Sequence, residues 1–130
     1  MSGKDNFLLD TNIVLGFLNG NVKITDFFEK NLMQSNLHVS QITRMELLGY
    51  PGITVQEEKQ LKKFLSYVKI LPINEAICDQ VIHLRREKKL KLPDALIAAT
   101  AIYFDLVLVT CDSDLLNKSK RFRSISPTTA

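Results

Sequence analysis

The chain has 130 residues, of which 45% are hydrophobic and 24% are charged, and these proportions fit one globular domain. Charges interrupt the apolar runs, so no stretch reaches the roughly 20 residues that a transmembrane helix needs. The first ten residues lack the apolar core and small-residue cleavage site of a signal peptide. We therefore expect a single domain over residues 1–130, in a cytoplasmic protein that does not contact a membrane.

The basic residues are concentrated in two runs. Seventeen Lys and Arg against fourteen Asp and Glu give a net charge of +3, but residues 85–91 and 118–123 hold nine of the seventeen and only one acid, Glu87. Such clusters favour a polyanionic partner, although a solvated helix face or tail would explain either run alone. Cys78 and Cys111 stand apart and not in CxxC pairs, which predicts two reduced, packed thiols rather than a disulfide or a zinc site.

Short apolar segments alternate with helical patterns from the beginning of the chain. Residues 7–9 form an apolar run that ends at Asp10. Apolar spacing predicts one helix around Val14 and a second over residues 24–33. Residues 37–40 then predict a second strand, so the first two strands are separated by helical sequence.

The middle of the chain repeats this alternation. Residues 42–48 have helical spacing and stop at the turn signals of residues 49–52. Thr54 and Glu57 form a capping box at the start of the next helix. Residues 68–73 overlap the end of that helix and predict a third strand.

The last third predicts two more helices and two more strands. Asn74 can cap one helix, and Pro93 suits the first position of a very apolar one. Residues 106–110 are apolar on both faces, as in the centre of a parallel sheet, and residues 121–126 predict an edge strand. The alternation predicts a three-layer α/β fold, with a central, mostly parallel sheet of about five strands flanked by helices.

Four acids occupy positions that suit a functional site. Asp10 ends the first strand, Asp112 follows residues 106–110 by two positions, and Glu46 and Asp94 interrupt apolar helical segments. A cap or a surface charge would explain each acid singly. Together, carboxylates at the ends of neighbouring parallel elements repel one another unless a cation is present. All-oxygen ligands favour Mg²⁺ or Mn²⁺, which points to phosphoryl chemistry.

Other catalytic schemes fit the sequence poorly. His38 lies in a predicted strand and His83 on the polar side of a helix, so neither supports nucleophilic or metal-free acid–base catalysis. The chain has no Gly-rich phosphate-binding motif. Haloacid-dehalogenase phosphatases also begin with a strand that ends in Asp, but they need a second Asp where this chain has Asn12.

Four segments in order resemble the PIN-domain ribonucleases, in the short form of VapC-type toxins from toxin–antitoxin pairs: LLDTN at 8–12, ITRMELL at 42–48, LPDALIAATA at 92–101 and LVTCDSDLL at 108–116. The resemblance implies a catalytic set of Asp10, Glu46, Asp94 and Asp112. It implies metal ligation by Asp10, Asp94, Asp112 and Asp114, with supporting polar residues at Thr11, Asn12 and Thr110. Leu115 departs from the pattern, since many relatives have Phe there, and this affects packing more than chemistry.

The resemblance also implies a mechanism. One or two Mg²⁺ or Mn²⁺ ions would be bound, and Glu46 would either ligate a second ion or orient the attacking water. Cleavage of RNA would leave 5′-phosphate and 3′-hydroxyl ends. We expect the basic runs to bind RNA phosphates through Arg85, Arg86, Lys88, Lys89, Lys118 and Lys120.

The partners implied are a structured RNA, such as a particular tRNA, a small antitoxin over the acidic groove, and a second copy in a homodimer. Apolar residues of the first helices are candidates for the protein contacts, with ordinary core as the alternative: Phe17, Leu18, Phe27, Phe28 and Leu32. Two other functions stay open, a non-catalytic PIN-fold module that binds RNA or protein, and a DNA-directed or flap-type nuclease.

Overall fold

The structure is a computed structural model that describes residues 6–32, 36–88, 90–116 and 122–127. Its centre is a five-stranded sheet in the order β3-β2-β1-β4-β5, with all neighbouring strands parallel. The strands are β1 (Asn6–Leu9), β2 (Asn36–Ser40), β3 (Lys69–Leu71), β4 (Val107–Val109) and β5 (Ser124–Ile125). The α/β class and the parallel five-stranded sheet predicted from the sequence are confirmed.

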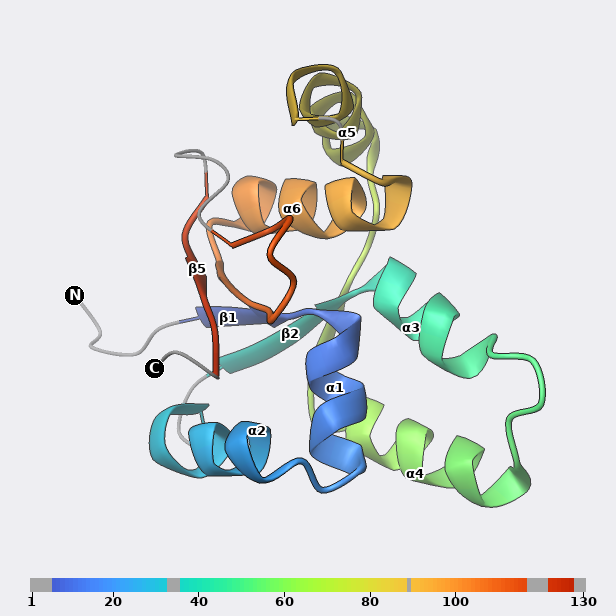
Figure 1. The fold of residues 1–130 in the computed structure, drawn as a ribbon. Coiled ribbons are helices and arrows are strands. Elements are labelled where there is room, and N and C mark those ends of the chain that lie inside the picture. The colour runs from blue at the N-terminus through green and yellow to red at the C-terminus, as the bar shows by residue number, and fades with distance from the viewer. Residues whose placement is uncertain (1–5, 33–35, 89, 117–121, 128–130) are drawn as a thin grey trace.

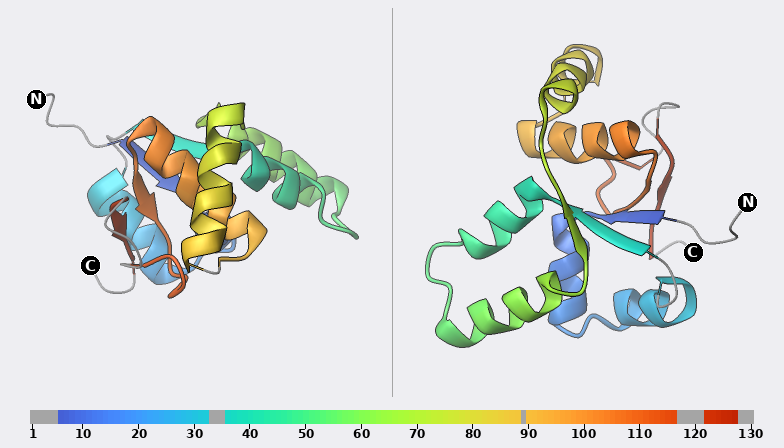
Figure 2. Two further views of the ribbon diagram at one scale, coloured as in Figure 1. Left: turned by 90° about the horizontal axis from the view of Figure 1, so that it is seen from above. Right: turned by 180° about the vertical axis from the view of Figure 1, so that it is seen from behind.

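Helices cover both faces of this sheet. They are α1 (Thr11–Leu18), α2 (Val22–Phe27), α3 (Gln41–Leu48), α4 (Val55–Leu65), α5 (Glu75–Lys88) and α6 (Leu92–Phe104), with a π-helix at Phe28–Leu32. Figure 1 shows α5 and α6 on one face and α1, α2 and α4 on the other. The view from behind in Figure 2 shows the same three layers.

Alternating side chains of the strands build a core on each face. Leu8 and its partner Leu108 are fully buried against α5 and α6, whereas Leu9 and its partner Val109 are fully buried on the face of α1, α2 and α4. Central strands that are apolar on both faces are typical of parallel sheets with helices on both sides. This packing fixes the register of β1 and β4, whose carboxyl ends therefore lie side by side.

Local capping signals fix where the helices begin. The Thr54 capping box forms in both directions, with N···O distances of 2.9 and 3.1 Å to Glu57. The Asn74 side chain accepts a hydrogen bond of 2.8 Å from the Ile77 N–H. Pro93 is the second residue of α6 and not the first, which Pro also tolerates because the N–H groups of the first turn have no helical partner.

Three local predictions were wrong. The single helix over residues 24–33 is divided into α2 and the π-helix, where the Phe28 ring stacks on Phe17 with centroids 4.3 Å apart. The third strand is shorter than residues 68–73, since Pro72 has no N–H for the ladder. Both cysteines are free but exposed, because Cys78 lies beside the buried stripe of α5 and Cys111 lies in the loop after β4.

The strand order places a switch point between β1 and β4. From β1 the chain proceeds to β2 and β3 on one side, whereas β4 and β5 lie on the other. Ligands in open α/β sheets bind beyond the carboxyl ends of the strands at such a point. None of the helices in the described ranges has the length and apolar character needed to span a bilayer.

Candidate metal centre

Asp10 lies at the carboxyl end of β1, and the protein holds both of its carboxylate oxygens. Its Oδ1 accepts a hydrogen bond of 2.8 Å from the Thr11 N–H, which makes it the N-cap of α1. Its Oδ2 accepts a hydrogen bond of 2.7 Å from the Thr110 hydroxyl. Asp10 is only 5% exposed, so the cap is also a buried carboxylate at the switch point.

Thr110, directly after β4, connects Asp10 to the following loop. It is fully buried, and besides donating to Asp10 it accepts a hydrogen bond of 3.0 Å from the Asp112 N–H. Asp112 in turn accepts a hydrogen bond of 2.8 Å at Oδ1 from the Asp114 N–H. These bonds set the loop in one conformation and hold Asp112 and Asp114 at the carboxyl edge of the sheet.

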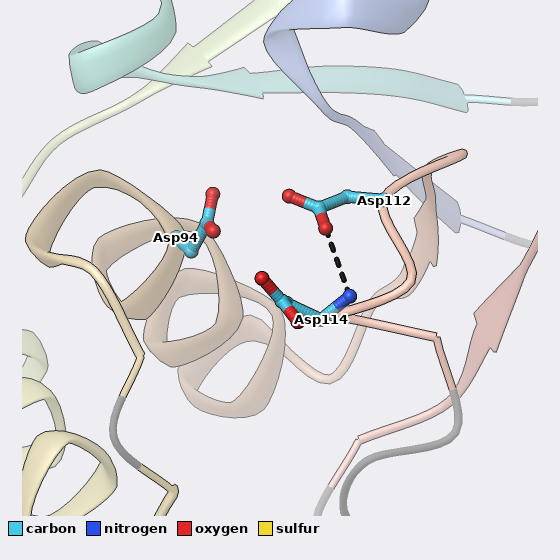
Figure 3. Close-up of side chains that lie close together, drawn as sticks. All are labelled: Asp94, Asp112 and Asp114. Carbon is cyan, nitrogen blue, oxygen red and sulfur yellow. Dashed lines mark hydrogen bonds between the residues drawn. The ribbon is translucent and has the colours of Figure 1, made fainter.

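Asp94, Asp112 and Asp114 form a group that we call the acid triad. One carboxylate oxygen from each residue can be chosen so that all three lie within 4.8 Å of one another. Asp94 is the third residue of α6, so the triad joins a helix N-terminus to the loop after β4 (Figure 3). Figure 3 shows the three carboxylates around a common space.

The electrostatics of the site reflect this crowding of acids. Burial raises the pKa of Asp94 from 3.8 to about 6, and the nearby Asp112, Asp10 and Asp114 carboxylates add to the effect. Burial also raises the pKa of Asp10, against the lowering effect of its bonds to Thr110 and Thr11, and Asp112 and Glu46 raise it further. The acids therefore interact, and a cation among them would relieve their repulsion.

Glu46 is an exposed residue of α3, close enough to Asp10 for its charge to raise the pKa of that carboxyl. The Thr11 hydroxyl donates a hydrogen bond of 2.7 Å to Glu46 Oε1. The same hydroxyl lies 3.0 Å from the hydroxyl of Thr43, a buried residue of α3. Sequence reasoning missed Thr43, although its position three residues before Glu46 places both side chains on neighbouring parts of one helix face.

Two other motif residues, Asn12 and Leu115, differ in burial. Asn12 is exposed, and within the described ranges no hydrogen bond joins it to an acid of the site. Leu115, the departure from the motif, is fully buried beside the Asp112 loop.

Three of the predicted basic residues lie in the last turn of α5. Arg85 and Arg86 are exposed near its end, and Arg85 Nε donates a hydrogen bond of 3.4 Å to the carbonyl of Leu90, just before α6. Lys88 is the last residue of α5. Lys89, Lys118 and Lys120 lie outside the described residues.

A groove of about 350 Å³ lies between α1, α3 and α4, and Thr11 and Glu46 are among its lining residues. Its lining combines apolar side chains with acids and amides: Leu15, Leu18, Asn19, Leu47, Tyr50, Ile53, Glu57, Gln60 and Leu61. Among the residues predicted for protein contacts, Leu18 lines the groove. Phe27 and Phe28 are buried in the core, Phe17 is half-buried against Phe28, and the side chain of Leu32 lies outside the description.

A sequence model of the PIN domain family matches residues 7–121. The chain belongs to the PIN domain family. The match includes the site acids and the threonines that hold them, so the resemblance seen in the four motifs is confirmed. No curated protein sequence is similar enough to this PIN domain to count as a match.

Several solved structures with the same fold come from toxin–antitoxin pairs. This chain is 30% identical in sequence to a chain of a toxin–antitoxin complex from Klebsiella pneumoniae. The two structures superpose with a TM-score of 0.78 over 92% of this chain and 96% of that chain. VapBC2 from Rickettsia felis, bound to a promoter DNA fragment, is 22% identical, with a TM-score of 0.80 over 93% and 98% of the two chains. DNA-bound VapBC from Salmonella typhimurium is also 22% identical, with a TM-score of 0.78 over 95% and 98%. The two structures at 22% identity show the fold alone. The match to the PIN domain family, together with these neighbours, supports a toxin–antitoxin nuclease family.

Proposed function

We propose that this PIN domain is a metal-dependent endoribonuclease and the toxin of a VapBC-type toxin–antitoxin pair. The observation that carries the proposal is the acid triad, with Asp10 and Glu46 beside it at the switch point of the sheet. Burial raises the pKa of Asp94, and the neighbouring carboxylates raise it further. The arrangement therefore costs stability unless a ligand of opposite charge binds there.

The donor set fits Mg²⁺ or Mn²⁺. Asp94, Asp112 and Asp114 offer only carboxylate oxygens, and hard divalent cations prefer oxygen ligands. We propose that the triad and Asp10 hold the ion. When bound, such an ion neutralises charge on a phosphodiester and promotes ionisation of a water molecule.

The residues around the ion have separate roles in this proposal. Thr110 and the Thr11 N–H hold Asp10 in one orientation. Glu46 Oε1 accepts a hydrogen bond from the Thr11 hydroxyl. We assign to Glu46 Oε2 the role of orienting the attacking water or ligating a second ion. The water gives up a proton to solvent and its oxygen forms a bond to phosphorus as the bond from phosphorus to the 3′ oxygen breaks. The 3′ oxygen takes a proton from solvent, which leaves 5′-phosphate and 3′-hydroxyl ends.

Positive charge near α6 supports a nucleic-acid substrate. Arg85 and Arg86 are exposed on the last turn and a half of α5, and Arg85 contacts the segment that leads into α6 and Asp94. Without the four catalytic acids the chain has ten acids against seventeen basic residues. We propose that these cations bind RNA phosphates, which predicts salt-dependent binding. A tRNA target, a homodimer and a cytoplasmic location remain predictions of the resemblance.

The groove between α1, α3 and α4 fits the antitoxin part of the proposal. Its lining is mainly apolar and includes two acids, Glu46 and Glu57. An antitoxin segment with an apolar face and a basic side chain matches this lining, and the structural neighbours come from complexes with antitoxins. A basic residue that reached Glu46 would compete with the divalent ion for the acids.

The alternative is a PIN-fold module that binds RNA or protein without cutting it. Complete retention of Asp10, Glu46, Asp94 and Asp112 counts against this function, because a binding module gains nothing from mutually repelling acids. A DNA-directed nuclease would share the metal chemistry, so substrate competition between RNA and DNA distinguishes it.

Cleavage of structured RNA in Mn²⁺ tests the proposal. We expect the wild type to leave 5′-phosphate ends, and we expect Asp10→Asn and Asp94→Asn to reduce the rate by at least about 100-fold, the scale of losing a preorganised catalytic group. Asp105→Asn is the matched control, because Asp105 is an exposed acid at the other end of α6. A folded Asp10→Asn variant with full activity would overturn the assignment.

A further inference from the structure

We propose that Thr43 is a positioning residue that acts through Thr11 on Glu46. The inference rests on the proposed nuclease function, and it concerns a residue that touches neither the acid triad nor the substrate. Thr43, Thr11 and Glu46 form a chain of two side-chain hydrogen bonds that runs from the buried side of α3, through the start of α1, back to the exposed side of α3.

The three groups are close enough for both hydrogen bonds. The Thr11 hydroxyl oxygen lies 2.7 Å from Glu46 Oε1 and 3.0 Å from the Thr43 hydroxyl oxygen. Thr43 is fully buried and Glu46 is exposed, with Thr11 between these extremes. The chain thus connects the rigid interior of the protein to a flexible side chain at the site.

The direction of these bonds follows from the chemistry of the groups. An ionised Glu46 carboxylate can only accept hydrogen bonds, so the single hydroxyl hydrogen of Thr11 is donated to it. That hydrogen is then not available to Thr43. The Thr43 hydroxyl must therefore be the donor to the Thr11 oxygen.

This direction gives Thr43 a role beyond packing. By donating to Thr11, it fixes the side-chain rotamer of Thr11, and it polarises the Thr11 hydroxyl so that the bond to Glu46 strengthens. An exposed Glu has several accessible rotamers, and the bond to Thr11 selects one of them. Glu46 is thereby held beside Asp10, whose pKa it raises.

The first test compares Thr43→Val, which removes the hydroxyl at similar shape, with Thr43→Ser, which keeps it. We expect Thr43→Val to lower kcat for RNA cleavage about 2- to 10-fold, the scale of one hydrogen bond, with KM unchanged, and Thr43→Ser to restore kcat. Thr100→Val is the matched control, because Thr100 is also fully buried but donates to the Leu96 carbonyl within α6. An unchanged kcat in Thr43→Val, or an equal loss in Thr100→Val, would overturn the inference.

The second test asks whether the effect passes through Thr11. In a Thr11→Val background we expect Thr43→Val to have no further effect on kcat, whereas independent action would give the same loss in both backgrounds and contradict the inference.

The third readout does not need activity. Three-bond couplings to the Thr11 methyl group report its rotamer, which we expect to be single in the wild type and averaged in Thr43→Val. A single rotamer in both proteins would overturn the inference. If the wild type does not cleave RNA, the proposed function is wrong. The couplings still test whether Thr43 fixes the rotamer of Thr11.

Discussion

Burial raises the pKa of both Asp10 and Asp94, but the protein gives the two acids different hydrogen-bond partners. Asp10 is buried, and both of its oxygens accept hydrogen bonds from the protein, one from the Thr11 N–H and one from the Thr110 hydroxyl. Asp94 is half-buried, and its pKa is raised to about 6 by burial and by the acids around it. One carboxylate is satisfied by the fold, whereas the other lacks a compensating positive charge.

The difference separates what holds the fold together from what prepares the site for a ligand. The bonds of Asp10 and Thr110 tie β1, α1 and the loop after β4 together, so this side contributes to stability without a metal. The acid triad stores repulsion that a proton or a divalent cation relieves. We therefore expect substitutions on the two sides to change stability in opposite directions when no metal is bound.

Metal binding is expected to give the largest difference between the sides. Mn²⁺ at about 100 times its dissociation constant should raise the free energy of unfolding of the wild type by about 2.7 kcal/mol. Asp94→Asn should remove most of this gain, and Asp105→Asn should keep it. Urea titrations with and without Mn²⁺ provide the measurement, and an equal gain in Asp94→Asn would place the ion elsewhere.

Loss of the Thr110 hydroxyl tests the Asp10 side. Thr110→Val leaves the Asp10 carboxylate and the Asp112 N–H without their partner. We expect a loss of about 1–3 kcal/mol in the free energy of unfolding without metal, the usual cost of unsatisfied buried polar groups. Thr110→Ser should recover most of it in the same urea titration. A neutral Thr110→Val would mean that these bonds contribute little.

The pH dependence of stability should show the smaller effect of the acid side. The pKa of Asp94 is about 6 in the folded protein and 3.8 is its ordinary value, so the folded state binds more protons between these values. Stability without metal should fall as pH rises from about 4 to about 6. The test compares the free energy of unfolding of the wild type with that of Asp94→Asn. The wild-type value minus the variant value should become more negative between about pH 4 and about pH 6, by an amount that solvent screening keeps small. A difference that stays constant from pH 4 to pH 7, measured with chelator present, would contradict the assignment.

The sequence predicted the parallel sheet for physical reasons, and the structure brings three of the predicted acids, Asp94, Asp112 and Asp114, together. Apolar strands with helical sequence between them can be buried only as a parallel sheet, and carboxylates at strand ends lie at one edge of it. The prediction of one helix over residues 24–33 was wrong because apolar spacing does not distinguish an α-helix from a π-helix. The prediction that both thiols are buried was wrong, because a Cys beside a buried helix stripe or after a strand can face solvent.

The candidate site was predicted less completely. Thr11 and Thr110 follow from the motifs, but Thr43 does not, since a threonine in a helix gives no sign of which hydroxyl it contacts. The groove lined by Glu46 is formed by residues of three helices, so it exists only once these helices have packed together. Phe27 and Phe28 are not a partner surface, because they are buried in the core on this face of the sheet.

The sequence by itself determined the fold class, the helix caps and the identity of the acids, because periodicity, capping and residue chemistry act over a few neighbouring positions. Tertiary structure decided which acids share a space. Packing of α6 on the sheet brings Asp94 to Asp112 and Asp114, and α1 against α3 brings Thr11 to Glu46. These contacts join residues far apart in the chain, so they depend on how whole elements pack, which no local pattern contains.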